Sequence, residues 1–155
     1  MATKQSILVY LVNDKTVCLG MKKKGYSQGK WNGFGGKIEA GESKKEAAIR
    51  EVMEETGVRI QSKDLVKRAS FYYHETPESW TVEVFLCNKW RGEIKESDEM
   101  KPQWFEINKL PSEQMWANDA LWIKQVLTGN KCLKGTFWHD ENNKITKYSL
   151  KEEQL

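Results

Sequence analysis

The feature that most limits how this chain can fold is a glycine-rich stretch that runs directly into a strongly marked helix. Residues 22–41 contain six glycines, interleaved with large side chains such as Trp31 and Phe34. This density of glycine opposes regular structure and lets the backbone approach a ligand closely. Flexible linkers lack such large apolar groups. We therefore expect residues 22–41 to form a functional loop.

The helix that follows is marked at both ends. Ser43 and Glu46 have the spacing of a capping box, and Gly57 occupies the position where a helix end favours a left-handed residue. These signals predict a helix from about Lys44 to Thr56.

One face of this helix is acidic, because Glu51, Glu54 and Glu55 fall within an arc of about 100°. A solvent-exposed acidic stripe is the simplest interpretation. However, like charges at this spacing repel, and they lie near the helix C-terminus, where the helix dipole disfavours anions. A bound Mg²⁺ would reverse both penalties and would favour phosphate chemistry.

The rest of the chain predicts strands and one further helix, hence an α+β domain. With 155 residues and 39% hydrophobic content, a single domain over residues 1–155 is expected. A helix is expected within Asn118–Leu127, with Gly129 as its stop signal. The expected strands are Ser6–Val12 and Lys15–Met21 as a hairpin, Val66–Tyr73, Trp80–Asn88, Gln103–Ile107, and a hairpin within Gly135–Leu150, with a turn at Glu75–Glu78.

Composition argues against several classes of protein. A formal charge of +3 is too balanced for a sequence-independent nucleic-acid binder. The apolar runs are shorter than the roughly 18 residues of a membrane span. Three cysteines without a metal-ligand spacing, Cys18, Cys87 and Cys132, favour reduced thiols in the cytoplasm. We expect no nucleic-acid or membrane partner, and a monomer.

The spacing from Gly36 through Glu42 to the run Arg50–Val58 resembles a complete Nudix box, the signature of the Nudix hydrolases. The resemblance implies a Nudix fold, with a mixed β-sheet between helices and the box as a loop, a helix and a second loop. It also implies hydrolysis of a nucleoside triphosphate to the monophosphate and pyrophosphate by a metal-activated water.

The resemblance further implies a bound Mg²⁺, with Mn²⁺ as an alternative. It leaves the general base open among Glu51, Glu55 and Glu99, and it places Lys22 near the substrate phosphates. Arg50 is expected to brace the loop against the helix together with Glu42. The implied metal ligands are Glu51, Glu54, Glu55 and Glu99, with the Gly36 carbonyl, and Gly35 and Gly36 also approach the substrate.

Segments outside the box resemble the animal MutT homologues of this family, which act on oxidised purine nucleoside triphosphates. The resemblance implies that the purine is bound or stacked by Asn32, Phe71, Trp116 and Asp119, in a pocket lined by Tyr26, Trp80, Met100 and Trp122. Two of these residues have simpler interpretations. Trp116 could be a core residue, and Asp119 could cap the second helix.

Asn118 departs from the animal pattern, which has a second aspartate at this position. Two adjacent carboxyl groups can share a proton, whereas Asn118 offers a fixed donor and a fixed acceptor to a modified purine. We therefore expect narrower selectivity, with 8-oxo-dGTP as the substrate. The alternatives are 2-oxo-dATP or N6-methyl-dATP as substrate, a nucleotide-binding module without catalysis, and an RNA-binding domain.

Overall fold

The computed structural model describes residues 3–25, 27–75 and 77–153, and its centre is the strand β1 (Thr3–Asn13). Successive side chains of a strand point to opposite faces of a sheet. The side chains of Ile7, Val9 and Leu11 enter one apolar cluster, and those of Leu8 and Tyr10 enter the other. A core therefore lies on each face of the sheet.

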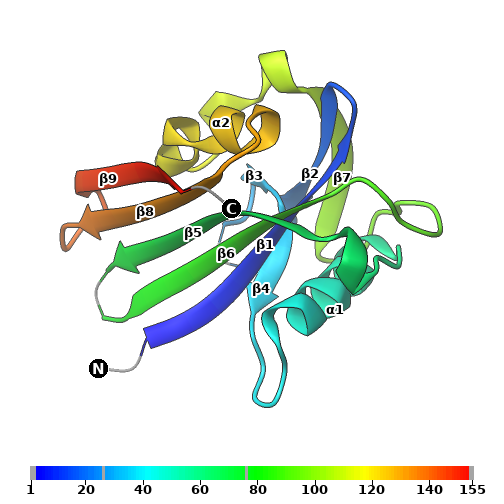
Figure 1. Ribbon diagram of the computed structural model, residues 1–155, viewed down its shortest axis with the longest axis horizontal. Coiled ribbons are helices and arrows are strands. Elements are labelled where there is room, and N and C mark those ends of the chain that lie inside the picture. Colours follow the sequence, from blue (N-terminus) through cyan, green and yellow to red (C-terminus); the bar gives the residue numbers. More distant parts are fainter. Residues whose placement is uncertain (1–2, 26, 76, 154–155) are drawn as a thin grey trace.

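Nine strands of the described residues belong to one mixed sheet. The helix α1 (Lys44–Thr56) packs on one face and α2 (Ile123–Thr128) on the other, and Figure 1 shows them on different sides of the sheet. The remaining strands are β2 (Thr16–Lys22), β3 (Trp31–Asn32), β4 (Phe34–Lys37), β5 (Val66–His74), β6 (Ser79–Cys87), β7 (Met100–Glu106), β8 (Cys132–His139) and β9 (Ile145–Glu153). This arrangement agrees with the expected α+β class.

The strand order is β3-β2-β1-β6-β5-β8-β9, with β4 added to β1 and β7 added to β2. The pairs β1/β6 and β5/β8 are parallel, and the other pairs are antiparallel. On one side of β1, residues 6–9 pair with β4 and residues 11–13 pair with β2. This division brings the glycine-rich stretch beside α1, and it positions the candidate site.

The helix α1 has the predicted bounds, because its signals are local. The Ser43 hydroxyl accepts from the Glu46 N–H, and the Glu46 carboxylate accepts from the Ser43 N–H, which completes the capping box. Gly57 ends the helix at φ 81°, in the left-handed region that favours glycine.

The glycine-rich stretch is more regular than predicted, because β3 and β4 lie within residues 22–41. Gly35 pairs with Leu8 across β1 and β4. A Cβ on Gly35 would lie 2.0 Å from the carbonyl oxygen of Ile7, so the absence of a side chain allows this close pairing.

A helix is present in the region Asn118–Leu127, as predicted, but α2 covers only the C-terminal half of that range. The chain forms a 3₁₀ helix over Ala117–Leu121, and α2 begins only at Ile123. Trp122 separates the two helices with φ −137° and ψ −16°, outside the helical region. Its indole is 2% exposed and packs in the core, which favours this break over a continuous helix.

The predicted strands are present, with ends displaced by at most three residues. The predicted turn at Glu75–Glu78 includes Thr76, which lies outside the described residues. The three cysteines are free and buried, as expected of reduced thiols. No helix in the part of the chain that the structure describes is long and apolar enough to cross a membrane.

Candidate active site

The glycine strand β4 and the helix α1 meet at Glu55, the most buried carboxylate of the acidic face. Glu55 is 5% exposed, and its Oε2 accepts from the Gly35 N–H at 2.9 Å. Burial raises the pKa of Glu55 to about 9, with a further increase from the charges of Glu51 and Glu99 that the Gly35 N–H only partly offsets. Burial and the neighbouring carboxylates thus disfavour the charged form of Glu55, and a cation bound beside it would favour that form.

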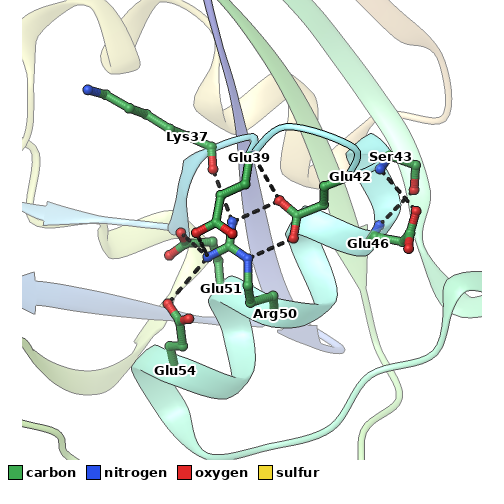
Figure 2. A network of polar contacts seen from close by, with 8 residues as sticks. All are labelled: Lys37, Glu39, Glu42, Ser43, Glu46, Arg50, Glu51 and Glu54. Atoms are coloured by element: carbon green, nitrogen blue, oxygen red, sulfur yellow. Dashed lines mark hydrogen bonds and ion pairs between the residues drawn. The ribbon is translucent and has the colours of Figure 1, made fainter.

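Arg50 organises the neighbouring carboxylates, as Figure 2 shows. Its guanidinium donates from Nε and Nη2 to both oxygens of Glu42, at 2.7 and 2.9 Å, and from Nη2 to the carbonyl of Lys37 at 3.1 Å. This bidentate pair lowers the pKa of Glu42 to about 2. The predicted bracing of the loop against the helix is therefore present in the structure.

The same guanidinium also reaches the acidic face. Its Nη1 donates to Glu51 at 2.8 Å and more loosely to Glu54 at 3.4 Å. Burial raises the pKa of Glu51, an effect that Arg50 opposes and that the charges of Glu54 and Glu99 reinforce. These electrostatic effects place Glu51, Glu54, Glu55 and Glu99 in one neighbourhood.

Within the described residues, no group of three His, Cys, Asp or Glu side chains is arranged to hold a metal ion. Arg50 engages Glu51 and Glu54, while Glu55 is turned to the Gly35 N–H. The donor set nevertheless fits a hard cation, because it consists of carboxylate oxygens with an excess of negative charge. A Cβ on Gly36 would lie 2.7 Å from Oε1 of Glu51, so Gly36 leaves room beside that carboxylate.

Lys22 lies on the same side as the acidic face. It ends β2, and its charge acts on Glu55 in the direction that lowers the pKa of that carboxyl group. This position is compatible with the expected contact to phosphate oxygens.

A second group of polar residues lies on the α2 side of the sheet, and we call it the amide cluster: Asn32, Asn118 and Asp119. Asn118 Oδ1 accepts from the Tyr73 hydroxyl at 3.1 Å and from the Trp122 indole N–H at 3.3 Å. The Asn118 Oδ1, which was expected to accept from a ligand, therefore already accepts two hydrogen bonds within the protein.

Asn32 is held in the same way. Its Oδ1 accepts from the Gly33 N–H at 2.8 Å and from the Tyr10 hydroxyl at 3.3 Å. Tyr10 also meets the Trp122 ring edge-on at 6.2 Å, so the supports of the two amides are in contact.

Asp119 completes the amide cluster and does not cap a helix. It lies inside the 3₁₀ helix, α2 has no side-chain cap, and the capping interpretation is wrong. The residue is 4% exposed, and its Oδ2 has no hydrogen-bond partner among the described residues. Burial raises the pKa of Asp119 to about 7. A buried polar atom without a partner is expensive in a folded protein.

The aromatic residues of the predicted base site divide between surface and core. Trp116 is half-buried, donates from its indole N–H to Ser27 Oγ at 3.0 Å, and has the Lys30 ammonium 5.4 Å from its ring centroid. Phe71 is 1% exposed and packs at 4.8 Å from Trp122, so it supports the amide cluster from the core and has no open ring face for stacking.

Of the four residues expected to line the pocket, Trp122 contacts the amide cluster, and Met100 packs in the core on the α1 side. Trp80 lies under the Lys37 ammonium, 5.5 Å from its ring centroid. Tyr26 lies outside the described residues.

Sequence reasoning missed Tyr10 and Tyr73, which orient the two amides. Both lie in strands; Tyr10 is fully buried, and Tyr73 is partly buried against the same core. The alternation that places them inward is visible in the sequence, but the contact between Tyr73 and Asn118 joins residues 45 positions apart.

Together, the mixed sheet and the acidic helix behind a glycine strand define a Nudix domain. Residues 2–126 match the model of the NUDIX domain family, and this chain belongs to that family. Nudix hydrolases generally require a divalent metal such as Mg²⁺.

Relatives extend this similarity over nearly the whole chain. The chain is 41% identical to the oxidized purine nucleoside triphosphate hydrolase of Danio rerio, over 97% of this chain and 96% of that protein. It is 37% identical to the enzyme of the same name from Mus musculus, over 94% and 92%. Among solved structures, a MutT protein from Bacillus halodurans superposes with a TM-score of 0.80 at 28% identity, covering 95% of this chain and 97% of that one.

Proposed function

We propose that this Nudix hydrolase cleaves oxidised purine nucleoside triphosphates, with 8-oxo-dGTP as the preferred substrate, to the monophosphate and pyrophosphate. The substrate class is supported by the identity of 41% and 37% to animal enzymes named for it, over nearly full length. The activity would remove damaged nucleotides from the pool used for DNA synthesis.

The observation that carries the proposed chemistry is the buried carboxylate of Glu55 beside Glu51 and Glu99. Such a set is unfavourable in isolation and is stabilised by a divalent cation. We assign Mg²⁺, or Mn²⁺ in its place, to Glu51, Glu54, Glu55, Glu99 and the Gly36 carbonyl. When bound, the cation offsets phosphate charge and lowers the pKa of water.

The chain's own residues would position the reactants. Gly35 holds the Glu55 carboxylate through its N–H, and Arg50 holds Glu51 from the other side. Water would attack one of the two phosphorus atoms, α or β, that flank the bridging oxygen, and the bond from that phosphorus to the bridging oxygen would break, so that the monophosphate and pyrophosphate separate. The proton lost by the water passes to one of the three carboxylates Glu51, Glu55 and Glu99. Lys22 would neutralise phosphate charge.

The base would be held by the amide cluster, with Trp116 stacking on the purine. Stacking on an aromatic ring contributes affinity, whereas hydrogen bonds to a base edge contribute selectivity. We further propose a single functional domain over residues 1–155 that acts as a cytoplasmic monomer without a nucleic-acid or membrane partner. The three buried free thiols and the balanced charge support this assignment.

The test is a pyrophosphate-release assay with purified protein and Mg²⁺ across a panel of triphosphates. The panel contains 8-oxo-dGTP, 2-oxo-dATP, N6-methyl-dATP, dGTP and dATP. We expect the highest kcat/KM for 8-oxo-dGTP and no release in excess chelator. If pyrophosphate release is fastest with N6-methyl-dATP, that nucleotide is the preferred substrate in place of 8-oxo-dGTP. If no nucleotide in the panel releases pyrophosphate, the result favours a nucleotide-binding module without catalysis.

A further inference from the structure

A cavity of about 240 Å³ lies between two segments on the side of the sheet that α1 covers. One segment follows α1, and the other belongs to the connection between β6 and β7. We call this cavity the basic pocket, because four of the residues that line it are cations: Arg59, Lys63, Lys89 and Arg91. None of its described lining residues belongs to the acidic face or to the amide cluster. The proposed function therefore gives this pocket no role.

The backbone fixes where two of these cations project. Arg59 and Arg91 form an antiparallel bridge in which each N–H donates to the carbonyl of the other residue, at 3.0 and 2.9 Å. Directly paired residues of antiparallel segments project their side chains to the same face. Val58 and Ile60 are buried in the core on either side of Arg59, which keeps Arg59 itself exposed. The two guanidinium groups therefore share one side of the bridge.

The charge of the basic pocket is not balanced within the chain. Four cations against one carboxylate, Asp64, leave the described lining residues with a formal charge of +3. Among the described residues, no ion pair involves any of these four cations. Like charges directly opposite each other in an antiparallel pair are destabilising. An anion bound between Arg59 and Arg91 would remove this penalty.

One wall of the basic pocket is an aromatic ring that the core holds in place. Trp90 packs against the apolar cluster on the α1 side and stacks on Trp104, with the ring centroids 6.0 Å apart and 29° between the planes. Gln61 contributes an amide that can donate to an anion. A concave site with charges of one sign and an apolar wall attracts a counter-ion more strongly than the same charges on a flat surface.

The composition of the basic pocket indicates which kind of anion it binds. The guanidinium of arginine matches the oxygens of phosphate or carboxylate with two parallel donors, and lysine adds a point charge. A formal charge of +3 favours an anion with more than one negative charge, which a single carboxylate does not carry. The cavity is smaller than the roughly 300–1,000 Å³ of pockets for drug-sized ligands, so an inorganic anion fits better than a nucleotide.

We propose that the basic pocket binds a small inorganic phosphate anion with more than one negative charge, such as pyrophosphate. Arg59 and Arg91 hold phosphate oxygens, and Lys63 and Lys89 neutralise the remaining charge. The proposal goes beyond the proposed hydrolysis and does not depend on it, because none of these residues belongs to the candidate active site. Pyrophosphate is also a product of the proposed hydrolysis, and it is the probe for the experiment.

The experiment measures binding of inorganic pyrophosphate to the purified protein by titration calorimetry in excess chelator. Without a divalent cation, the carboxylates of the acidic face repel this anion. Wild-type protein should bind pyrophosphate, and binding should weaken as the salt concentration rises. Arg59→Gln and Arg91→Gln should each weaken binding roughly tenfold, the effect of one hydrogen bond to a charged group. Lys124→Gln removes an exposed cation from α2 and should leave binding unchanged.

Two further titrations test the alternatives. If Lys22→Gln loses pyrophosphate binding while both arginine variants keep it, the anion occupies the candidate active site and the proposal is refuted. ADP carries a diphosphate group on a nucleoside, and Arg59→Gln should weaken ADP binding less than pyrophosphate binding; an equal or larger effect would assign the pocket to nucleotides instead. Thermal melting shows that each variant is folded. Absence of binding to wild type, or unchanged binding in both folded arginine variants, would also overturn the proposal.

Discussion

Replacing Asp119 by asparagine should make the ligand-free protein more stable relative to wild type as the pH rises. Burial raises the pKa of Asp119 from its ordinary value of 3.8 to about 7. In the unfolded chain the carboxyl group ionises near pH 4, whereas in the folded chain it stays protonated to about pH 7. Wild-type stability is therefore unaffected below about pH 4, is lost progressively between pH 4 and 7, and stays at the lower level above.

The expected size follows from these two pKa values. Each pH unit inside this window costs about 1.4 kcal/mol, and rounding at the upper end leaves about 2–3 kcal/mol between pH 5 and 8. An amide does not titrate in this range, so the pH-dependent part of the difference between Asp119→Asn and wild type isolates this one group. The part of the difference that is the same at every pH reports how the amide introduced by the substitution packs in the core.

The assay is urea unfolding of both proteins at pH 5, 6, 7 and 8, without nucleotide. The free energy of unfolding of the variant minus that of wild type should rise by about 2–3 kcal/mol between pH 5 and 8 and should level off above pH 7. Asp140→Asn is the matched control, because the N–H groups of Lys144 and Asn142 lower the pKa of that exposed carboxyl group. Its difference should stay constant from pH 5 to 8, because a group with a lowered pKa changes stability only below about pH 4. If the difference in the free energy of unfolding between Asp119→Asn and wild type does not change with pH, the Asp119 carboxyl group is not buried without a partner.

Four further variants test the site. Glu54→Gln and Glu55→Gln should each lower kcat by orders of magnitude in Mg²⁺ without lowering the metal-free melting temperature, because burial already disfavours the charge of Glu55 and Glu54 contacts Arg50 only loosely, at 3.4 Å; near-normal turnover in both would exclude their role as ligands. Gly36→Ala should lower kcat in a folded protein, because its Cβ would lie 2.7 Å from an oxygen of Glu51; unchanged steady-state kinetics would contradict this contact. Trp116→Ala should weaken nucleotide binding by about 1–3 kcal/mol in calorimetry; normal affinity with a much lower melting temperature would make Trp116 a structural residue.

The helix α1 could be predicted to the residue, because its limits depend on local chemistry. Ser43, Glu46 and Gly57 form their capping contacts within one turn of the helix ends. The three-glutamate face follows from helical periodicity alone. What the sequence does not contain is the contact of Glu55 with Gly35, which depends on a strand paired to β1.

That strand could not be predicted, for a physical reason. Glycine has a low strand propensity, so Gly35 and Gly36 argue against regular structure when only local preference is considered. In the fold, β1 passes so close to Gly35 that any side chain would collide with the carbonyl of Ile7. The requirement for glycine is therefore tertiary, and the same is true of the break at Trp122.

The amide cluster shows the same limit at the level of a single side chain. The sequence indicated Asn118 as a residue that distinguishes this chain, but not which end of its amide a ligand meets. The orientation depends on a hydroxyl from β5 and an indole one turn away. Similarly, capping was a sound local interpretation of Asp119, and it fails because the chain places this carboxyl group in the interior.

The most direct test of the proposed activity is identification of the products formed from 8-oxo-dGTP. The purified protein is incubated with the nucleotide and Mg²⁺, and the mixture is separated by ion-exchange chromatography, with a chelator control and Glu55→Gln in parallel. We expect 8-oxo-dGMP and pyrophosphate in equal amounts with wild type, and neither product in the two controls. Formation of the diphosphate and inorganic phosphate, or intact 8-oxo-dGTP after prolonged incubation with Mg²⁺, would contradict the proposed function.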